Sequence, residues 1–265
     1  MSMQRLVAIM ERLRDPENGC PWDREQTLES IAPYTVEEVY EVVDSIAEGD
    51  MPGLCDELGD LLFHVVFYSQ IAREQGVFDF DDVSRGICEK MIRRHPHVFA
   101  DAEVADAAEQ TREWERLKAA ERAARPGGDG SGHLDGIARA LPALVRANKL
   151  QKRAAKVGFD WEQPPAVLDK VREELDELER ELSGSPVSER QVAEEMGDLL
   201  FSCVNLARHL GYDAESLLRD ANGKFEKRFH RMEVLLRDQG VGLEQGDMSQ
   251  MDRAWNRVKR EERGE

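Results

Sequence analysis

The chain carries two short acidic stretches that decide its fold: Glu-Glu-Leu-Asp-Glu at residues 173–177 and Glu-Glu-Met-Gly-Asp at residues 194–198. Glu174 and Glu177 are three residues apart and share one face of a helix, and Glu195 and Asp198 repeat that spacing. In a helical hairpin the two pairs face each other. Four carboxylates at one place repel one another unless a cation lies between them, and oxygen ligands suit a hard ion such as Mg²⁺. The stretches therefore predict a helical hairpin that holds a metal ion.

The rest of the sequence follows the same helical pattern. Apolar residues recur at i, i+3, i+4 and i+7 almost throughout, and the alternating β-branched runs of strands do not occur. This predicts an all-α protein. The spacing Thr35-x-x-Glu38 is typical of a capping box and predicts a helix that begins at Thr35. Gly59 and Gly197, each inside an expected helix, indicate the close approach of another helix or of a ligand.

The second half of the sequence repeats the first half in order. Four motifs recur in the same order in the two halves: Glu-Glu-x-x-Glu at 37–41 and 173–177, Glu-x-Gly-Asp-Leu-Leu-Phe at 57–63 and 195–201, Lys-x-x-x-Arg at 90–94 and 224–228, and Trp-x-x-x-Lys at 114–118 and 255–259. Between the halves, residues 125–136 have the glycine-rich composition of a flexible linker. We therefore predict two tandem helical-bundle domains, residues 1–124 and 137–265.

Charge and cysteine usage narrow the classes of partner. The formal net charge of -18 disfavours a nucleic acid polymer or an anionic membrane surface as the partner, because both are anionic. The longest apolar runs are too short to span a bilayer, and the first residues lack the uninterrupted apolar core of a signal peptide. The four cysteines include no Cys-x-x-Cys pair, which fits a reducing compartment. We expect a cytoplasmic protein.

Basic side chains near the acidic stretches are candidates for binding phosphate. Lys170 precedes Glu174 by one helical turn, and Lys224 and Arg228 share a helix face. Arginine grips phosphate oxygens with two donors, and lysine supplies a point charge. Pairing of Lys224 with a nearby acid such as Asp220 explains that lysine equally well.

The motif formed by Trp255 and Lys259 also has two possible interpretations. The tryptophan is either an anchor of the core or a flat surface on which a base stacks, with the lysine as a further phosphate contact. Residue type alone favours the core.

These motifs, together with Leu-Arg-Asp-Pro-Glu-Asn-Gly-Cys-Pro-Trp-Asp at residues 13–23, resemble the MazG family of all-α nucleoside triphosphate pyrophosphohydrolases. The resemblance covers nearly the whole chain, including the tandem arrangement. It implies hydrolysis of a nucleoside triphosphate to the monophosphate and pyrophosphate, with Mg²⁺ or in its place Mn²⁺, in a homodimer whose bundles complete one another. A role in control of the nucleotide pool is then expected.

The resemblance also assigns residues. It implies metal ligation by four acids, Glu174, Glu177, Glu195 and Asp198, and nucleotide contacts by Lys170, Lys224, Arg228 and Trp255. A carboxylate not committed to the metal, Glu173 or Glu194, is a candidate general base, and we also expect Glu194 to contact the substrate.

The first half carries a second set of candidate residues: Glu37, Glu38, Glu41, Glu57, Asp60, Lys90 and Arg94. Tyr34 occupies the position that matches Lys170, and His95-Pro96 ends the basic helix at once. We therefore expect a weaker or regulatory site here and the main catalytic site in the second half.

Two other classes remain open. A di-metal carboxylate bundle, such as a di-iron protein, also draws acids from four helices, but its motif is Glu-x-x-His, and aspartate fills the histidine position in both halves. A non-catalytic helical module for dimerisation or nucleotide binding, with solvated acids, fits the composition as well.

Overall fold

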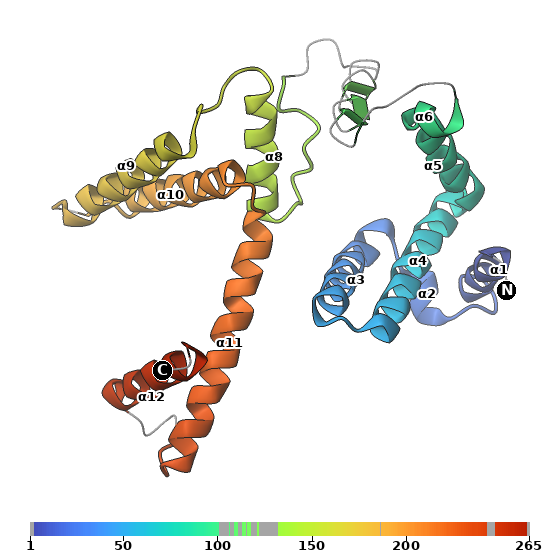
Figure 1. The fold of residues 1–265 in the computed structure, drawn as a ribbon. Helices are drawn as coiled ribbons and strands as arrows, with labels where there is room; N and C mark the ends of the chain where they lie inside the picture. Colours follow the sequence, from blue (N-terminus) through green and yellow to red (C-terminus); the bar gives the residue numbers. More distant parts are fainter. Residues whose placement is uncertain are drawn as a thin grey trace. The chain divides into compact units, whose positions relative to one another are not determined.

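A computed structural model describes residues 3–100, 106, 109–110, 113–114, 116–117, 121, 132–185, 187–242 and 247–263. The chain divides into two compact units, Met1–Arg125 and Pro126–Glu265. Every regular element in the described ranges is a helix, which confirms the all-α prediction (Figure 1). The exact domain limits stay a prediction, and residues 125–131 of the expected linker lie outside the described residues.

The first unit is built around a helical hairpin. Its helices are α1 (Met3–Leu13), α2 (Pro21–Glu25), α3 (Leu28–Glu48), α4 (Met51–Glu74), α5 (Phe80–Arg94) and α6 (Pro96–Phe99). Helices α3 and α4 pack along each other, and Gly49 reverses the chain between them in the left-handed conformation, at φ 73°. Helix α1 packs against α4, and the core between the helices comprises Met10, Ile31, Val66, Phe67 and Ile71.

The predicted helix start at Thr35 is wrong. Helix α3 begins at Leu28, because the Thr27 hydroxyl accepts from the Ser30 backbone N–H at 3.2 Å and the Ser30 hydroxyl accepts from the Thr27 N–H at 2.9 Å. This reciprocal cap satisfies the free N–H groups at the true start of the helix. Thr35 lies inside α3, where its hydroxyl is 2.7 Å from the hydroxyl of Tyr68 on α4.

The second unit contains two hairpins. Its helices are α8 (Ala143–Ala155), α9 (Pro164–Ser183), α10 (Glu189–His209), α11 (Ala214–Asp238) and α12 (Met248–Arg263). Helices α9 and α10 pack along each other, and α8 packs against α10. Helix α11 runs away from that hairpin and packs with α12 (Figure 1). A separate core lies between α11 and α12 and comprises Met232, Leu235, Leu236, Ala254 and Val258.

The α9–α10 hairpin leaves apolar side chains in contact with solvent. Leu175, Met196, Leu200 and Phe201 have exposed fractions between 43% and 55%. Large exposed apolar surfaces of this kind mark sites of association. Within the described ranges, no helix combines the length and the apolarity that crossing a bilayer requires.

Candidate metal and nucleotide site

The α9–α10 hairpin brings three of the four predicted metal ligands together. Glu174 on α9 and Glu195 and Asp198 on α10 each offer a carboxylate oxygen, and these oxygens lie within 4.8 Å of one another. Glu174 is only 5% exposed, so its charge is costly unless a counter-charge is present. The three oxygens form a set of hard ligands of the kind that Mg²⁺ prefers.

Glu177 lies near this cluster without joining it. Its Oε1 accepts a hydrogen bond from Arg180 Nη2 at 3.0 Å, an ion pair one turn along α9. The charge of Glu177 still acts on the site: burial raises the pKa of Glu195, and the negative charges of Glu177 and Glu174 raise it further. The structure therefore places Glu177 at the edge of the cluster.

Lys170 supplies the positive charge that the cluster requires. Its Nζ lies 2.8 Å from Glu174 Oε1 and 2.9 Å from Glu173 Oε1. These two hydrogen bonds, the one to Glu174 first, raise the pKa of Lys170 above its usual range. The sequence predicts that Lys170 contacts the phosphates of a nucleotide. In this structure its ammonium neutralises the buried carboxylate of Glu174. Glu194, the other candidate base, is exposed.

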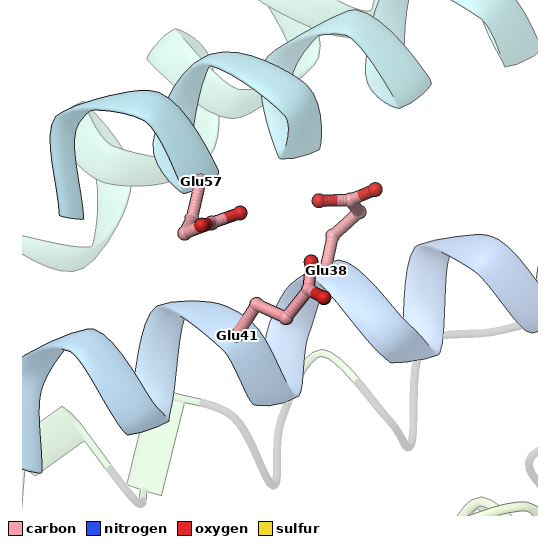
Figure 2. A group of neighbouring side chains, drawn as sticks. All are labelled: Glu38, Glu41 and Glu57. Atoms are coloured by element: carbon pink, nitrogen blue, oxygen red, sulfur yellow. The ribbon is translucent and has the colours of Figure 1, made fainter. Parts of the chain in front are cut away.

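A similar cluster lies in the first unit. Figure 2 shows Glu38 and Glu41 on α3 and Glu57 on α4, with their carboxylates in the space between the two helices, and these three groups also lie within 4.8 Å of one another. Burial raises the pKa of Glu38, and the charge of Asp60 raises it further. Oε2 of Glu38 is buried and has no hydrogen-bond partner among the described residues.

No ammonium approaches the first cluster from the position that matches Lys170. Tyr34 stands there, and its ring packs edge-on against Trp22 with the ring centroids 6.1 Å apart. The two clusters therefore have two matched acids in common, Glu38 with Glu174 and Glu57 with Glu195. They differ in the third acid, which is Glu41 in the first cluster and Asp198 in the second, and in their counter-charge.

The other predicted phosphate-binding residues, apart from Lys170 on α9, lie on the α11–α12 hairpin of the second unit. Arg228 on α11 donates to Glu262 Oε2 from Nε at 2.8 Å and from Nη2 at 2.7 Å. These bonds lower the pKa of Glu262, and the charge of Lys224 lowers it further. Within the described ranges, no hydrogen bond or ion pair joins Lys224 or Arg228 to the α9–α10 carboxylates.

The first unit repeats this ion pair, which the sequence reasoning missed. Arg94, like its neighbour Arg93, donates to Glu121. Their hydrogen bonds, that from Arg94 first, lower the pKa of Glu121 to about 2. Both acceptor glutamates follow the repeated tryptophan by seven residues, Glu121 after Trp114 and Glu262 after Trp255, so the repeat carried a usable signal. Lys90 is half-buried on the same helix as Arg94.

Trp255 packs at the edge of the second core. Its ring centroid lies 5.3 Å from that of Phe225, and its side chain touches the buried core residues of α11 and α12. This favours the core reading over a free stacking surface. Lys259, one turn along α12, is half-buried, and its first-half counterpart Lys118 lies outside the described residues.

Comparison with known proteins identifies the family. Residues 26–99 and 162–232 match the model of the MazG nucleotide pyrophosphohydrolase domain. The chain belongs to the MazG family. The matched stretches contain the α3–α4 and α9–α10 hairpins and hence both carboxylate clusters of this MazG protein.

Individual relatives extend this match over almost the whole chain. The sequence is 52% identical over 260 residues to a nucleoside triphosphate pyrophosphohydrolase of Escherichia coli strain K12, and this alignment covers 98% of each chain. It is 45% identical over 256 residues to the nucleoside triphosphate pyrophosphohydrolase/pyrophosphatase MazG of Thermotoga maritima, and this alignment covers 97% of this chain and 95% of the relative. The family resemblance inferred from the sequence motifs is confirmed.

Proposed function

We propose that this MazG protein hydrolyses nucleoside triphosphates to nucleoside monophosphates and pyrophosphate at the α9–α10 carboxylate cluster. The observation that carries the proposal is the gathering of Glu174, Glu195 and Asp198 from two helices within 4.8 Å, with Glu174 buried. The relatives named for this activity support it, since their similarity extends over the entire hairpin.

The donor set fits a divalent metal ion. The three groups offer only carboxylate oxygens, which favours Mg²⁺, with Mn²⁺ as a substitute. Glu177 can become a fourth ligand, because its pair with the exposed Arg180 is a surface ion pair of low energy. When bound, the ion neutralises charge on the phosphate oxygens and acidifies a coordinated water.

The protein groups around the cluster carry the remaining tasks. Lys170 moves from the carboxylates to the phosphate oxygens once Glu174 has another counter-charge, and there it stabilises the charge that develops on pyrophosphate. Glu194 is exposed next to Glu195, and Glu173 follows Lys170 by three residues, so either carboxylate can accept the proton of the attacking water.

We infer that the active protein is a homodimer. The exposed apolar residues of α9 and α10 require a cover. An added Cβ at Gly197, as at Gly59, meets nothing within 4 Å in the described chain, so the close neighbour expected at these glycines is not found within the chain itself. A second copy supplies the cover, and its α11–α12 hairpin, in which Trp255 anchors the core, brings Lys224, Arg228 and Lys259 to the phosphates of the bound nucleotide.

Mixing two inactive variants tests the dimer. If each site combines acids of one copy with basic residues of the other, then Glu174→Gln and Arg228→Ala chains regain part of the activity when they are refolded together. A protein that light scattering shows to be a monomer and that is fully active contradicts the shared site. A mixed dimer of the two variants that forms but regains no activity contradicts it as well.

The first cluster is the weaker candidate site. Glu38, Glu41 and Glu57 also offer carboxylate oxygens, but Tyr34 replaces the lysine, so one phosphate contact is lost. We assign it a regulatory or secondary role. The four free cysteines are consistent with a cytoplasmic location. A role in control of the nucleotide pool follows from the proposed hydrolysis of nucleoside triphosphates and not from the cysteines.

Two other functions make different predictions. The described clusters contain carboxylates and no histidine, which disfavours a di-iron centre, and metal analysis of the purified protein checks this. A non-catalytic module predicts no turnover. The deciding assay incubates the protein with ATP and Mg²⁺ and separates the products. AMP and pyrophosphate in equal amounts support the proposal, whereas ADP and phosphate, or no product, overturn it.

A further inference from the structure

Between α8 and α10 lies a buried layer of polar side chains that the proposed chemistry does not use. It comprises Asn148 and Gln151 on α8 and Ser202 and Asn205 on α10, each at most 9% exposed. Gln151 donates from Nε2 to the backbone carbonyl oxygen of Phe201 at 2.8 Å, so its orientation is fixed. Its Oε1, and Oδ1 of Asn148, are buried without a hydrogen-bond partner among the described residues. Folded proteins rarely leave two such acceptors together unsatisfied, so the layer indicates a missing donor.

The internal repeat shows that the fold does not require an amide at the position of Asn205, although the first unit also keeps a buried polar side chain, His64, at the position of Ser202. In the first unit, the residues seven and ten positions after Glu57 are His64 and Phe67; in the second unit, Ser202 and Asn205 stand at those distances after Glu195. Phe67 is fully buried in an apolar core that includes Met10 of α1. The second unit has kept the acids and placed an amide where the first unit packs a phenyl ring.

The layer continues the face of α10 that carries the carboxylates. Ser202 and Asn205 follow Asp198 by four and seven residues, so they share its face and lie about 6 and 10 Å further along the helix axis. A nucleotide whose phosphates are held at Glu174, Glu195 and Asp198 has its sugar and base extending over a comparable length. Gln151 is hydrogen-bonded to the carbonyl oxygen of Phe201, one residue before Ser202, so it lies beside this part of α10, at a length that a nucleotide can span.

Asn205 is fixed as a donor in this layer. Its Oδ1 accepts from Arg208 Nε at 2.9 Å and from Arg208 Nη2 at 2.6 Å. Arg208 in turn donates to Asp160 Oδ2 at 3.0 Å. With its oxygen committed, Asn205 can offer only N–H groups to a ligand.

We propose that Asn148 and Gln151 accept hydrogen bonds from N–H groups on the pairing edge of the nucleobase, at the end of α10 beyond the carboxylates. The proposal rests on the proposed function, since it assigns the base subsite of the same nucleotide. Each standard base carries at least one N–H group on that edge. The site therefore accepts all of them and rejects a base without such a donor.

The wild-type protein already tests this with matched substrates. Purine riboside 5′-triphosphate has the shape of ATP but lacks the amino group, and methyl triphosphate has no base. We expect kcat/KM for ATP to exceed that for purine riboside 5′-triphosphate by about tenfold or more, because a buried acceptor stays unpaired with the second substrate. Equal values overturn the base subsite and leave the proposed function intact. A protein that cleaves none of the three substrates refutes the proposed function and with it this subsite.

Two variants separate base binding from a structural role. Gln151→Met and Asn148→Leu remove the acceptors at nearly constant volume, and Gln239→Met makes the same change at an exposed position as a control. We expect the first two to lower kcat/KM for ATP to the value for purine riboside 5′-triphosphate without changing that for methyl triphosphate, and the control to change neither. A uniform loss with all three substrates shows a structural role and overturns the proposal.

Discussion

Replacing Lys170 by methionine removes the counter-charge of the buried Glu174 while keeping the length of the side chain. The lysine side chain is 31% exposed and that of Glu174 is 6% exposed, with 2.8 Å between Nζ and Oε1. Exposed ion pairs contribute about 0–1 kcal/mol, and breaking a buried pair costs about 3–5 kcal/mol. This pair has one buried and one partly exposed member, so we expect the variant to lose about 1–2 kcal/mol in the absence of metal.

Magnesium should reverse part of that loss. A divalent ion at the cluster neutralises Glu174 whether or not Lys170 is present, so the ion gains more favourable charge interactions in the variant. For a unit of the size of Pro126–Glu265, the deficit corresponds to about 3–8 °C in melting temperature. We expect this deficit in melting temperature to shrink when millimolar Mg²⁺ is added. The rise in melting temperature on adding Mg²⁺ should therefore be larger for Lys170→Met than for the wild type.

The assay is thermal unfolding followed by circular dichroism, with EDTA or with Mg²⁺. Lys149→Met, at an exposed position on α8, is the matched control and should show the wild-type shift. A Lys170→Met protein whose Mg²⁺-induced shift equals or falls below that of the wild type would refute the reasoning that the ammonium and the metal share one counter-charge role.

Two further predictions concern the stability of the second unit. The hydrogen bond from Arg208 lowers the pKa of Asp160 to about 2. The stabilising charge is therefore complete above the unfolded pKa near 4 and is lost as the pH falls through about 2. Asp160→Asn should cost about 1–2 kcal/mol at pH 7 and less than about 0.5 kcal/mol at pH 2, as measured by urea unfolding at both pH values. Leu236 is 1% exposed in the α11–α12 core, so Leu236→Ala should lower the free energy of unfolding by about 2–5 kcal/mol, and a change under 1 kcal/mol would contradict this core.

The sequence predicted the α3–α4 and α9–α10 hairpins and most of the residues of the two acidic clusters, because these depend on helical period alone. Residues three or four apart must share a face, and the short turns at Gly49 and near Ser188 reverse the chain. The exact partner of each charge could not be predicted in this way. Glu177 has Arg180 within one turn, and Lys170 has both Glu173 and Glu174, so the choice among neighbours depends on rotamers and burial.

The start of α3 and the partner of Arg228 show two further limits. The prediction used the pattern of a threonine followed three residues later by a glutamate, which Thr35 and Glu38 fit by chance. The actual cap pairs Thr27 with Ser30, and that pattern does not include serine at the third position. Glu262 lies 34 residues from Arg228, and such a separation can be recovered only from the internal repeat, in which Glu121 stands at the matching place. In the proposed homodimer the exposed α9–α10 face packs against a second copy, and a single sequence does not display such a contact.

The central claim is that the α9–α10 cluster performs the hydrolysis and that the α3–α4 cluster is secondary. Product analysis of ATP turnover with Mg²⁺ in Glu174→Gln and in Glu38→Gln, both in the full chain, tests it most directly, because the two acids occupy matching positions in the repeat. We predict that Glu174→Gln abolishes the release of AMP and pyrophosphate with the helical content unchanged, whereas Glu38→Gln retains most of it. Near-normal turnover in Glu174→Gln, or its loss in Glu38→Gln alone, would contradict the assignment.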